Sequence, residues 1–263
     1  MGTANSLKKT TLFVAQPEFT ASSEQQFGRR SAPSRDWISN VFRSGLSTLS
    51  CASILWVLAY SGAATAGAWP RGEGKSFLSF SIDQGLSSDG SPYASLFYEY
   101  GVNERLTLGI DAGRNLTSGN QFSIAFARSS FSKGPNQFAY ELGVGTDKNG
   151  GETKAALRPG LSWGRGYTAS WGDGWLGVES TYMFLEDGSG LGKLDSTFGV
   201  NNANGALTII QLQYSKRSDQ DSSIAIAPSY VFEARPNVYI ETGIAYQFSS
   251  STASVKLGIW SQF

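Results

Sequence analysis

The sequence has no histidine and a single cysteine, Cys51, and these absences exclude several kinds of chemistry. Without histidine there is no Ser–His or Cys–His dyad and no histidine-bound metal. One cysteine cannot form a disulfide within the chain. Nucleotide-binding fingerprints and phosphate-binding loops are also absent. The sequence therefore predicts no metal, no cofactor and no enzyme activity, although carboxylate pairs could still support acid–base chemistry.

Charged residues are scarce, at 16% of the chain against about 25% in typical soluble proteins. The formal net charge is zero and the isoelectric point is near 6.3, so the basic excess of a nucleic-acid-binding protein is missing. Aromatic residues reach 13%, and there are 31 glycines against 8 prolines. This composition favours a β-sheet that faces lipid over a water-soluble globule.

Long apolar runs are also rare, and the run Leu49–Tyr60 has the features of a secretory signal peptide. It follows the basic Arg43 and ends in small residues with an Ala-x-Ala pattern. We predict a signal peptide over 41–66, cut after Ala66 with Ala64 and Ala66 as the recognised residues. Cleavage after Ala68 also fits, and the competing interpretation is a transmembrane helix over about 46–68.

Residues 1–40 are polar and have no hydrophobic periodicity. They are predicted to be a disordered extension. Because this stretch is unusually long before a signal peptide, a second hypothesis is that translation starts near Val41.

From Gly74 onward, apolar and polar residues alternate, as in half-buried β-strands. Successive runs are about nine to twelve residues long, which is the length that a tilted strand needs to cross a bilayer. Short turn clusters such as SSDGSP, GVNER and DKNGGE separate the runs and leave no room for crossover helices. The prediction is an all-β fold: an antiparallel up-and-down transmembrane β-barrel of about 12 strands over 67–263.

One face of each run is apolar and is expected to face lipid. Examples are Leu78, Phe80 and Ile82; Leu106, Leu108 and Ile110; Phe122, Ile124 and Phe126; and Val255, Leu257 and Ile259. Aromatic residues near the run ends suit interfacial girdles.

A soluble β-sandwich or lipocalin-like barrel would alternate too, but the polar face here is rich in Gly, Ala and Ser, which suits a crowded lumen. Pro159 and Pro228 lie within strands, and we expect β-bulges there.

The face opposite to lipid carries charge, because an unpaired charge in lipid is costly. The residues predicted to line the lumen are Asp83, Glu99, Asp111, Glu141, Arg158, Glu179, Lys193, Asp195, Glu241 and Lys256. Two interpretations stay open. The carboxylates could line a narrow channel for small polar or cationic solutes. Alternatively, Arg158 and Lys256 pair with Glu141, Glu179 and Glu241 and close a structural barrel.

The final SVKLGIWSQF alternates and ends on Phe263, and so resembles the C-terminal strand of bacterial outer-membrane β-barrels, with Ile259 and Phe263 in phase. FYEYGVNERLTLGID is similar to a strand, periplasmic turn and strand of this class. The run from AWPRGEGKSF through that turn is similar to small uncharacterised outer-membrane transporters related to aromatic-degradation pathway porins, and the resemblance covers about Trp69–Phe263.

The resemblance implies residence in the bacterial outer membrane, with both termini periplasmic. It also implies outer-membrane lipid, the barrel-assembly machinery and periplasmic chaperones as partners, and it carries no catalytic motif. It makes no prediction of oligomeric state.

Overall fold

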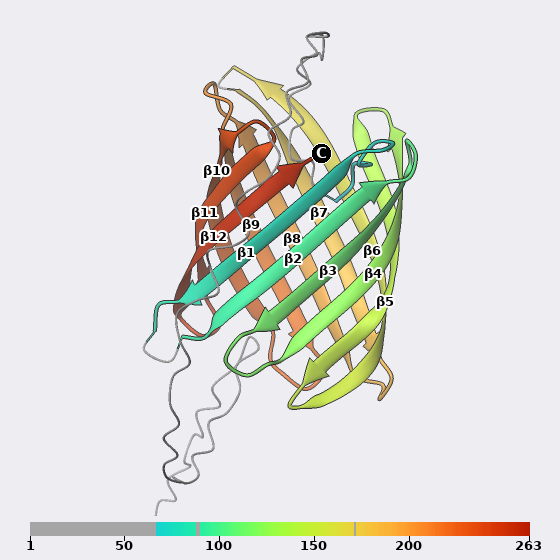
Figure 1. Cartoon of the computed structure of the whole chain (residues 1–263), viewed down its shortest axis with the longest axis vertical. Coiled ribbons are helices and arrows are strands. Elements are labelled where there is room, and N and C mark those ends of the chain that lie inside the picture. The colour runs from blue at the N-terminus through green and yellow to red at the C-terminus, as the bar shows by residue number, and fades with distance from the viewer. Residues whose placement is uncertain (1–66, 88–89, 171) are drawn as a thin grey trace, which may run out of the picture. The chain divides into compact units, whose positions relative to one another are not determined.

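The protein forms a closed barrel of twelve antiparallel strands (Figure 1). The computed structural model describes residues 67–87, 90–170 and 172–263. The predicted extension, the signal peptide and its residues Ala64 and Ala66 lie outside the described residues. The strands are β1 Ser76–Gly85, β2 Pro92–Gly101, β3 Leu106–Asn115, β4 Gln121–Lys133, β5 Asn136–Asn149, β6 Glu152–Ala169, β7 Gly172–Leu185, β8 Gly190–Asn201, β9 Leu207–Arg217, β10 Ser223–Arg235, β11 Val238–Gln247 and β12 Thr252–Gln262.

Each strand pairs with its sequence neighbours, and β1 pairs with β12 to close the sheet. At the seam, the amide of Ser76 donates to the carbonyl of Phe263 over 2.6 Å. The start of β1 and the end of β12 thus lie at one end of the barrel, here called the terminal end. The opposite end, formed by the β1–β2 turn and every second turn after it, is called the far end. No helix among the described residues has the length and hydropathy to span a membrane.

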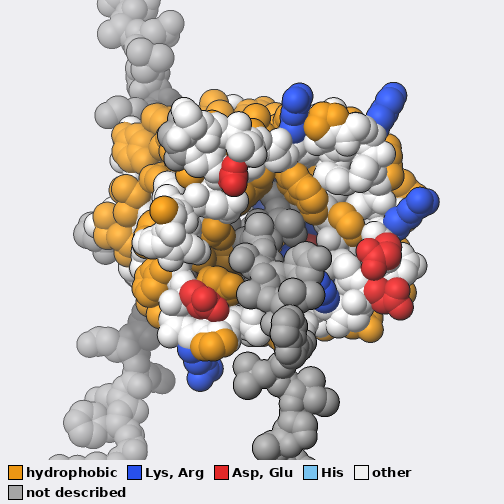
Figure 2. All heavy atoms as spheres, turned by 90° about the horizontal axis from the view of Figure 1, so that it is seen from above, with side chains coloured by type: hydrophobic (Ala, Val, Ile, Leu, Met, Phe, Trp, Pro, Cys, Tyr) orange, Lys and Arg blue, Asp and Glu red, His pale blue; other side chains and the backbone are white. Residues whose placement is uncertain are grey.

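The outer face is apolar on eleven strands, as the alternation predicts. Leu108, Leu142, Leu161 and Leu257 are among its most exposed side chains. Viewed from the terminal end, apolar side chains occupy the outer circumference and charged ones gather on the rim (Figure 2). Such an apolar outer surface suits contact with hydrocarbon.

Aromatic pairs lie on the outer face towards both ends of the barrel. At the terminal end Phe131 stacks on Phe138, with ring centroids 5.5 Å apart. At the far end Tyr182 contacts Phe184 at 4.6 Å, and Tyr246 contacts Phe248 at 5.3 Å. Two aromatic bands therefore flank the apolar surface, in the positions where membrane barrels carry interfacial girdles.

The prediction for β4 is wrong. Phe122, Ile124 and Phe126 were expected on the outer face, but Ile124 is 0% exposed and Phe126 is 4% exposed, and both lie in the lumen. The register fixes this, because Phe126 pairs with Gly109 on one side and Gly143 on the other, both on inner faces. The residues that face outward in the middle of β4, such as Ala125 and Ala127, are small, and Phe131 faces outward near its end.

The expected bulges at Pro159 and Pro228 are absent. Pairing between β6 and β7 keeps one register on both sides of Pro159, and pairing between β10 and β11 does so across Pro228. Each proline stays paired with one neighbour, Leu142 and Ile210 respectively. A missing amide therefore costs one ladder bond without shifting the strand. The register shift in β10 lies instead between Glu233 and Arg235.

Candidate functional site in the barrel lumen

All ten charged residues predicted for the lumen lie on the inner face. Cross-strand pairs such as Asp83 with Lys256, Glu99 with Gly109 and Glu179 with Asp195 place them on one continuous inner surface. Some of these residues form direct ion pairs, and others do not. Most of the paired residues gather on one wall of the lumen, and the opposite wall is polar and more exposed.

The wall formed by β2–β6 holds a chain of ion pairs, here called the arginine network: Arg71, Glu99, Arg128, Glu141, Arg158 and Asp111. Arg128 binds Glu99 Oε1 at 2.5 Å and Glu141 Oε2 at 2.8 Å. Arg158 binds Glu141 Oε1 at 3.0 Å and Asp111 Oδ2 at 2.5 Å. Arg71 pairs with the other oxygen of Glu99. Cations and carboxylates alternate along the network, so each bridging group has an opposite charge on both sides.

The network is buried: Glu99 is 2% exposed and Arg128 is 5% exposed. A buried charge without a partner is very costly, whereas an arginine that donates several hydrogen bonds to carboxylates is tolerated. Among the described residues, buried side-chain atoms without a hydrogen-bond partner include Arg158 Nε. The carboxylates of this wall are thus neutralised by arginine and do not form a free acidic ring.

Glycines on the neighbouring strands make room for the bulky side chains of β4. A Cβ at residue 109 would lie 2.2 Å from Phe126 Cζ, and one at residue 143 would lie 2.5 Å from Ile124 Cγ2. The Phe126 ring lies below the guanidinium of Arg128, 5.0 Å from its Cζ. Large residues on one strand thus pack against glycines on the next in this wall.

Residues 67–75, the lumen segment, precede β1. Its first part, as far as Arg71, contacts the inner face, and residues 73–75 are exposed. The amide of Gly67 donates to Glu179 Oε1 over 2.8 Å, and the amide of Arg71 donates to Thr107 Oγ1 over 3.2 Å. Trp69 lies so close to Gly164 that a Cβ there would be 2.3 Å from its ring. Three strands of the inner face therefore hold this segment.

Trp69 also packs against an apolar group on the opposite wall, here called the tryptophan cluster: Trp175, Leu207, Ile209 and Val231, with Trp69, Tyr239 and Trp260 at its edge. The Trp260 indole donates to Glu241 Oε2 over 3.1 Å, and Lys256 lies 3.8 Å from Glu241 Oε1. The lumen segment thus lies between the arginine network and the tryptophan cluster. This narrows the terminal end.

Towards the far end, the wall from β8 through β12 to β1 remains polar and partly exposed. Its members are Asp83, Lys193, Asp195, Gln211, Gln213, Ser215 and Lys256. Small residues such as Ala225 and Gly243 alternate with them on the inner faces of β10 and β11. We call this surface the polar wall. Solvent can reach it, in contrast to the buried arginine network.

The far-end rim carries two further ion pairs. Arg217 of β9 binds Asp147 of β5 at 3.1 Å, across the mouth. Lys154 binds Asp187 in the β7–β8 turn at 2.5 Å. Hydrogen bonds from Lys154 and from Ser189 hold the pKa of the Asp187 carboxyl well below its ordinary value. Asp187 therefore stays ionised through the physiological pH range.

The sequence prediction missed Arg128, which bridges Glu99 and Glu141, and Arg71, which ends the arginine network. A signal for Arg128 was present, because it is in phase with Phe122 and Phe126. An arginine in phase with a supposed lipid-facing row contradicts that orientation. Arg71 precedes the alternating region, and no periodicity indicated where it would lie. Among the described residues, no group of three or more potential metal ligands occurs.

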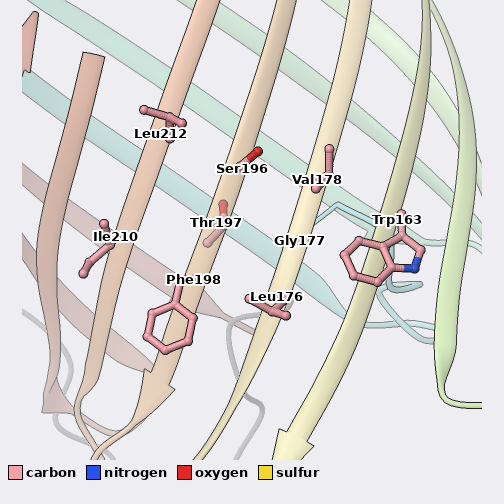
Figure 3. A pocket seen from close by; sticks show the side chains of 9 residues that line it. All are labelled: Trp163, Leu176, Gly177, Val178, Ser196, Thr197, Phe198, Ile210 and Leu212. Carbon is pink, nitrogen blue, oxygen red and sulfur yellow. The ribbon is translucent and has the colours of Figure 1, made fainter. Parts of the chain in front are cut away.

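A pocket of about 290 Å³ lies on the outer face of β6–β9, away from the lumen. Figure 3 shows apolar side chains around it, with the small Ser196 between them. Its lining residues are Trp163, Leu176, Gly177, Val178, Ser196, Thr197, Phe198, Ile210 and Leu212. It is a notch in the apolar outer surface and is not part of the candidate site.

Comparison with known proteins relates the chain to others by its fold. No family model and no curated protein matches the sequence. The KdgM porin is similar in structure, with a TM-score of 0.55, 8% identity and coverage of 71% of this chain and 99% of the porin. The COG4313 outer membrane channel from Pseudomonas putida F1 has a TM-score of 0.46 and 8% identity, with coverage of 76% and 99%. The likeness to the KdgM porin shows that the chain has the β-barrel fold of this porin.

Proposed function

We propose that the protein is a narrow outer-membrane channel for small polar solutes, lined by the polar wall. The observation that carries this proposal is the contrast between the two walls of the lumen. The arginine network is buried and neutralised, whereas Asp83, Asp195 and Gln213 on the polar wall are partly exposed. A solute passing through would contact the polar wall, because the opposite wall is filled by side chains.

The preference for cations is expected to be weak. The sequence prediction of a cationic solute depended on free carboxylates, but Glu99, Asp111 and Glu141 are paired with arginine. Outside the arginine network and the ion pairs at the rim, the lumen carries Asp83, Glu179, Asp195 and Glu241 against Lys193 and Lys256, which is an excess of two negative charges. Such an excess selects charge only weakly compared with a ring of like charges.

The proposal puts the terminal end in the periplasm and the far end outside the cell. An even strand number returns the chain to the side where it started, and bacterial barrels of this type have periplasmic termini. The resemblance to transporters related to aromatic-degradation pathway porins remains a prediction from the sequence.

We also propose outer-membrane lipid, the barrel-assembly machinery and periplasmic chaperones as partners. Ile259 and Phe263 are 53% and 68% exposed on the outer side of β12. An apolar strand that ends in an exposed aromatic residue is available for recognition before the barrel closes. An enzymatic role is not part of the proposal, and hydrolysis of lipid by the purified protein would contradict it.

Single-channel recording in planar bilayers tests the channel, with protein isolated from the outer membrane of a host that expresses the full chain. Discrete openings of low conductance are expected. Gln213→Trp places a bulky ring on the polar wall and should reduce the conductance, whereas Leu212→Trp, on the outer face of the same strand, should leave it unchanged. Equal effects of both variants would refute conduction along the polar wall.

A non-conducting structural barrel is the second candidate. The lumen segment and the arginine network favour it, because together they fill much of the terminal end. A folded barrel that never opens in the bilayer would establish this alternative and exclude the channel.

A further inference from the structure

The contact between Gly67 and Glu179 lies at the predicted signal-peptide cleavage site. Gly67 follows Ala66, and its backbone nitrogen is 2.8 Å from Glu179 Oε1 on the inner face of β7. In the uncut chain this nitrogen is an amide. After cleavage between Ala66 and Gly67, the same nitrogen is the α-amino group of the mature protein.

We propose that cleavage after Ala66 creates an ammonium group that pairs with Glu179 and anchors the lumen segment inside the barrel. In this step a signal peptidase hydrolyses the Ala66–Gly67 peptide bond. Water supplies the hydroxyl to the Ala66 carbonyl carbon and a hydrogen to the Gly67 nitrogen, which takes up a further proton at neutral pH. The inference rests on export of the protein, as in the proposed function.

The electrostatics of the site favour a further positive charge beside Glu179, in addition to the more distant Arg128 and Lys193. Glu179 pairs across the sheet with Asp195, so two carboxylates lie side by side on the inner face. Within the described part of the chain, no ion pair within 4.0 Å involves either of them. Adjacent carboxylates disfavour each other's ionised form, and a nearby cation relieves this. An ammonium also makes a stronger hydrogen bond to a carboxylate than an amide does.

Glycine fits closely against Glu179 at this position. A Cβ on residue 67 would lie 2.6 Å from Glu179 Oε2 and 2.7 Å from its Cδ. A side chain would therefore require the flexible carboxylate end of Glu179 to move from its present place. Cleavage after Ala66 leaves glycine as the first residue and keeps this contact as it is.

The alternative cut after Ala68 fits the structure less well. It would remove Gly67 together with Ala68, which is 1% exposed inside the barrel. The new first residue would be Trp69, whose ring packs against Gly164 and the tryptophan cluster. No amino group would then reach Glu179. The geometry thus distinguishes the two sites that the sequence left open.

The anchors along the lumen segment hold the amine in place. Arg71 is fixed by Glu99 and by Thr107, and Trp69 is fixed by the inner wall. An ammonium at Gly67 adds a third anchor, on β7, at the free end of the segment. In the precursor this end carries no charge, so the complete anchoring would arise only after processing.

The first test is the N-terminus of the barrel isolated from the outer membrane of a host expressing the full chain, determined by intact mass and N-terminal sequencing. The proposal expects Gly67. Trp69 as the first residue would overturn the inference but leave the proposed channel intact. A protein absent from the outer membrane would instead overturn the proposed function.

The second test measures release of the lumen segment. Trypsin can cut after Arg71 only when this residue leaves the lumen. The cut removes residues 67–71, and the loss of their mass from the barrel is measured. Glu179→Gln is expected to make this cut about tenfold faster, through loss of one charge-assisted hydrogen bond. Glu104→Gln in the exposed β2–β3 turn is the control and should leave the rate unchanged.

A second variant keeps every lumen side chain. Insertion of one glycine between Ala66 and Gly67 leaves the cleavage motif intact and moves the amine away from Glu179 by one residue. This insertion should accelerate cleavage after Arg71 as Glu179→Gln does. The variant with both changes should be cleaved at about the same rate as either single variant. If cleavage after Arg71 is as slow in both folded variants as in the unchanged protein, the proposed ion pair between the Gly67 ammonium and Glu179 is refuted.

Discussion

At the scale of single residues, Arg128 is the side chain that links three strands of the lumen, and no sequence pattern predicted this role. It reaches Glu99 on β2 and Glu141 on β5 from a position that is 5% exposed. Its removal would leave two buried carboxylates with fewer positive partners. Loss of one member of a buried ion pair costs about 3–5 kcal/mol, which is a large part of the stability of many proteins.

Arg128→Met is therefore expected to lower the free energy of unfolding by about 3–5 kcal/mol. The measurement is urea unfolding of the barrel in detergent micelles, followed by the gel mobility difference between folded and unfolded protein. Lys133→Met, at the exposed end of the same strand, is the control and should change little. A similar small loss in both variants would show that the network contributes no net stability.

Gly109 is a second residue whose identity is dictated by its neighbour. Gly109→Ala brings a methyl group to 2.2 Å from Phe126 Cζ. Overpacking of this kind costs about 1–3 kcal/mol. The combination with Phe126→Leu should recover part of that loss in the same unfolding assay, because the carbonyl oxygen of Tyr98, 2.6 Å from the same Cβ, stays in place. Gly166→Ala, whose Cβ would meet its nearest atom at 3.8 Å, should be tolerated, and a cost equal to that of Gly109→Ala would contradict the steric explanation.

At the scale of single strands, the alternation predicted where each strand runs but not always which face is inside. On most strands the apolar face is also the outer face. On β4 the larger residues Phe122, Ile124 and Phe126 face inward because Gly113, Gly143 and Gly109, respectively, leave space for them. Such complementarity joins residues on three strands and cannot be seen within one strand. The charge of Arg128 was the local clue to the true orientation.

The orientation of β4 can be tested with one position. Ala125 is exposed at the middle of the outer face, so Ala125→Lys should cost about 2–4 kcal/mol in lipid vesicles, as for a charge at the bilayer midplane. Ala125→Leu should be nearly neutral there, because an added apolar side chain would only contact lipid. If leucine is costly and lysine is tolerated, Ala125 faces the lumen and the assigned register is wrong.

At the scale of the whole molecule, the number of strands, their antiparallel order and the closure of the barrel were predicted from run lengths and short turns. The side chains and the segment that fill the lumen could not be predicted in this way. The lumen segment lies before the first alternating run, and its partners Glu179 and Glu99 are 112 and 28 residues from Gly67 and Arg71 respectively. Contacts of such separation depend on the assembled barrel, which no local pattern encodes.

Assembly of the whole barrel is expected to depend on its last residue. Deletion of Phe263 removes the exposed aromatic group and the carbonyl that accepts from Ser76. The amount of heat-modifiable protein in the outer membrane should fall several-fold, while that of a Phe248→Ala variant, which loses an aromatic group at the far end, should stay closer to the original. Equal amounts of the deletion and the intact protein would show that Phe263 has no part in assembly.

The seam between β1 and β12 has a consequence for the order of biosynthesis. Of the twelve strands, the first and the last to be synthesised become neighbours, so their pairing is the most distant contact along the sheet. Until β12 is complete, any partial sheet keeps two open edges that could pair with other chains. The unfinished polypeptide must therefore be kept apart from its own copies until its last strand has paired.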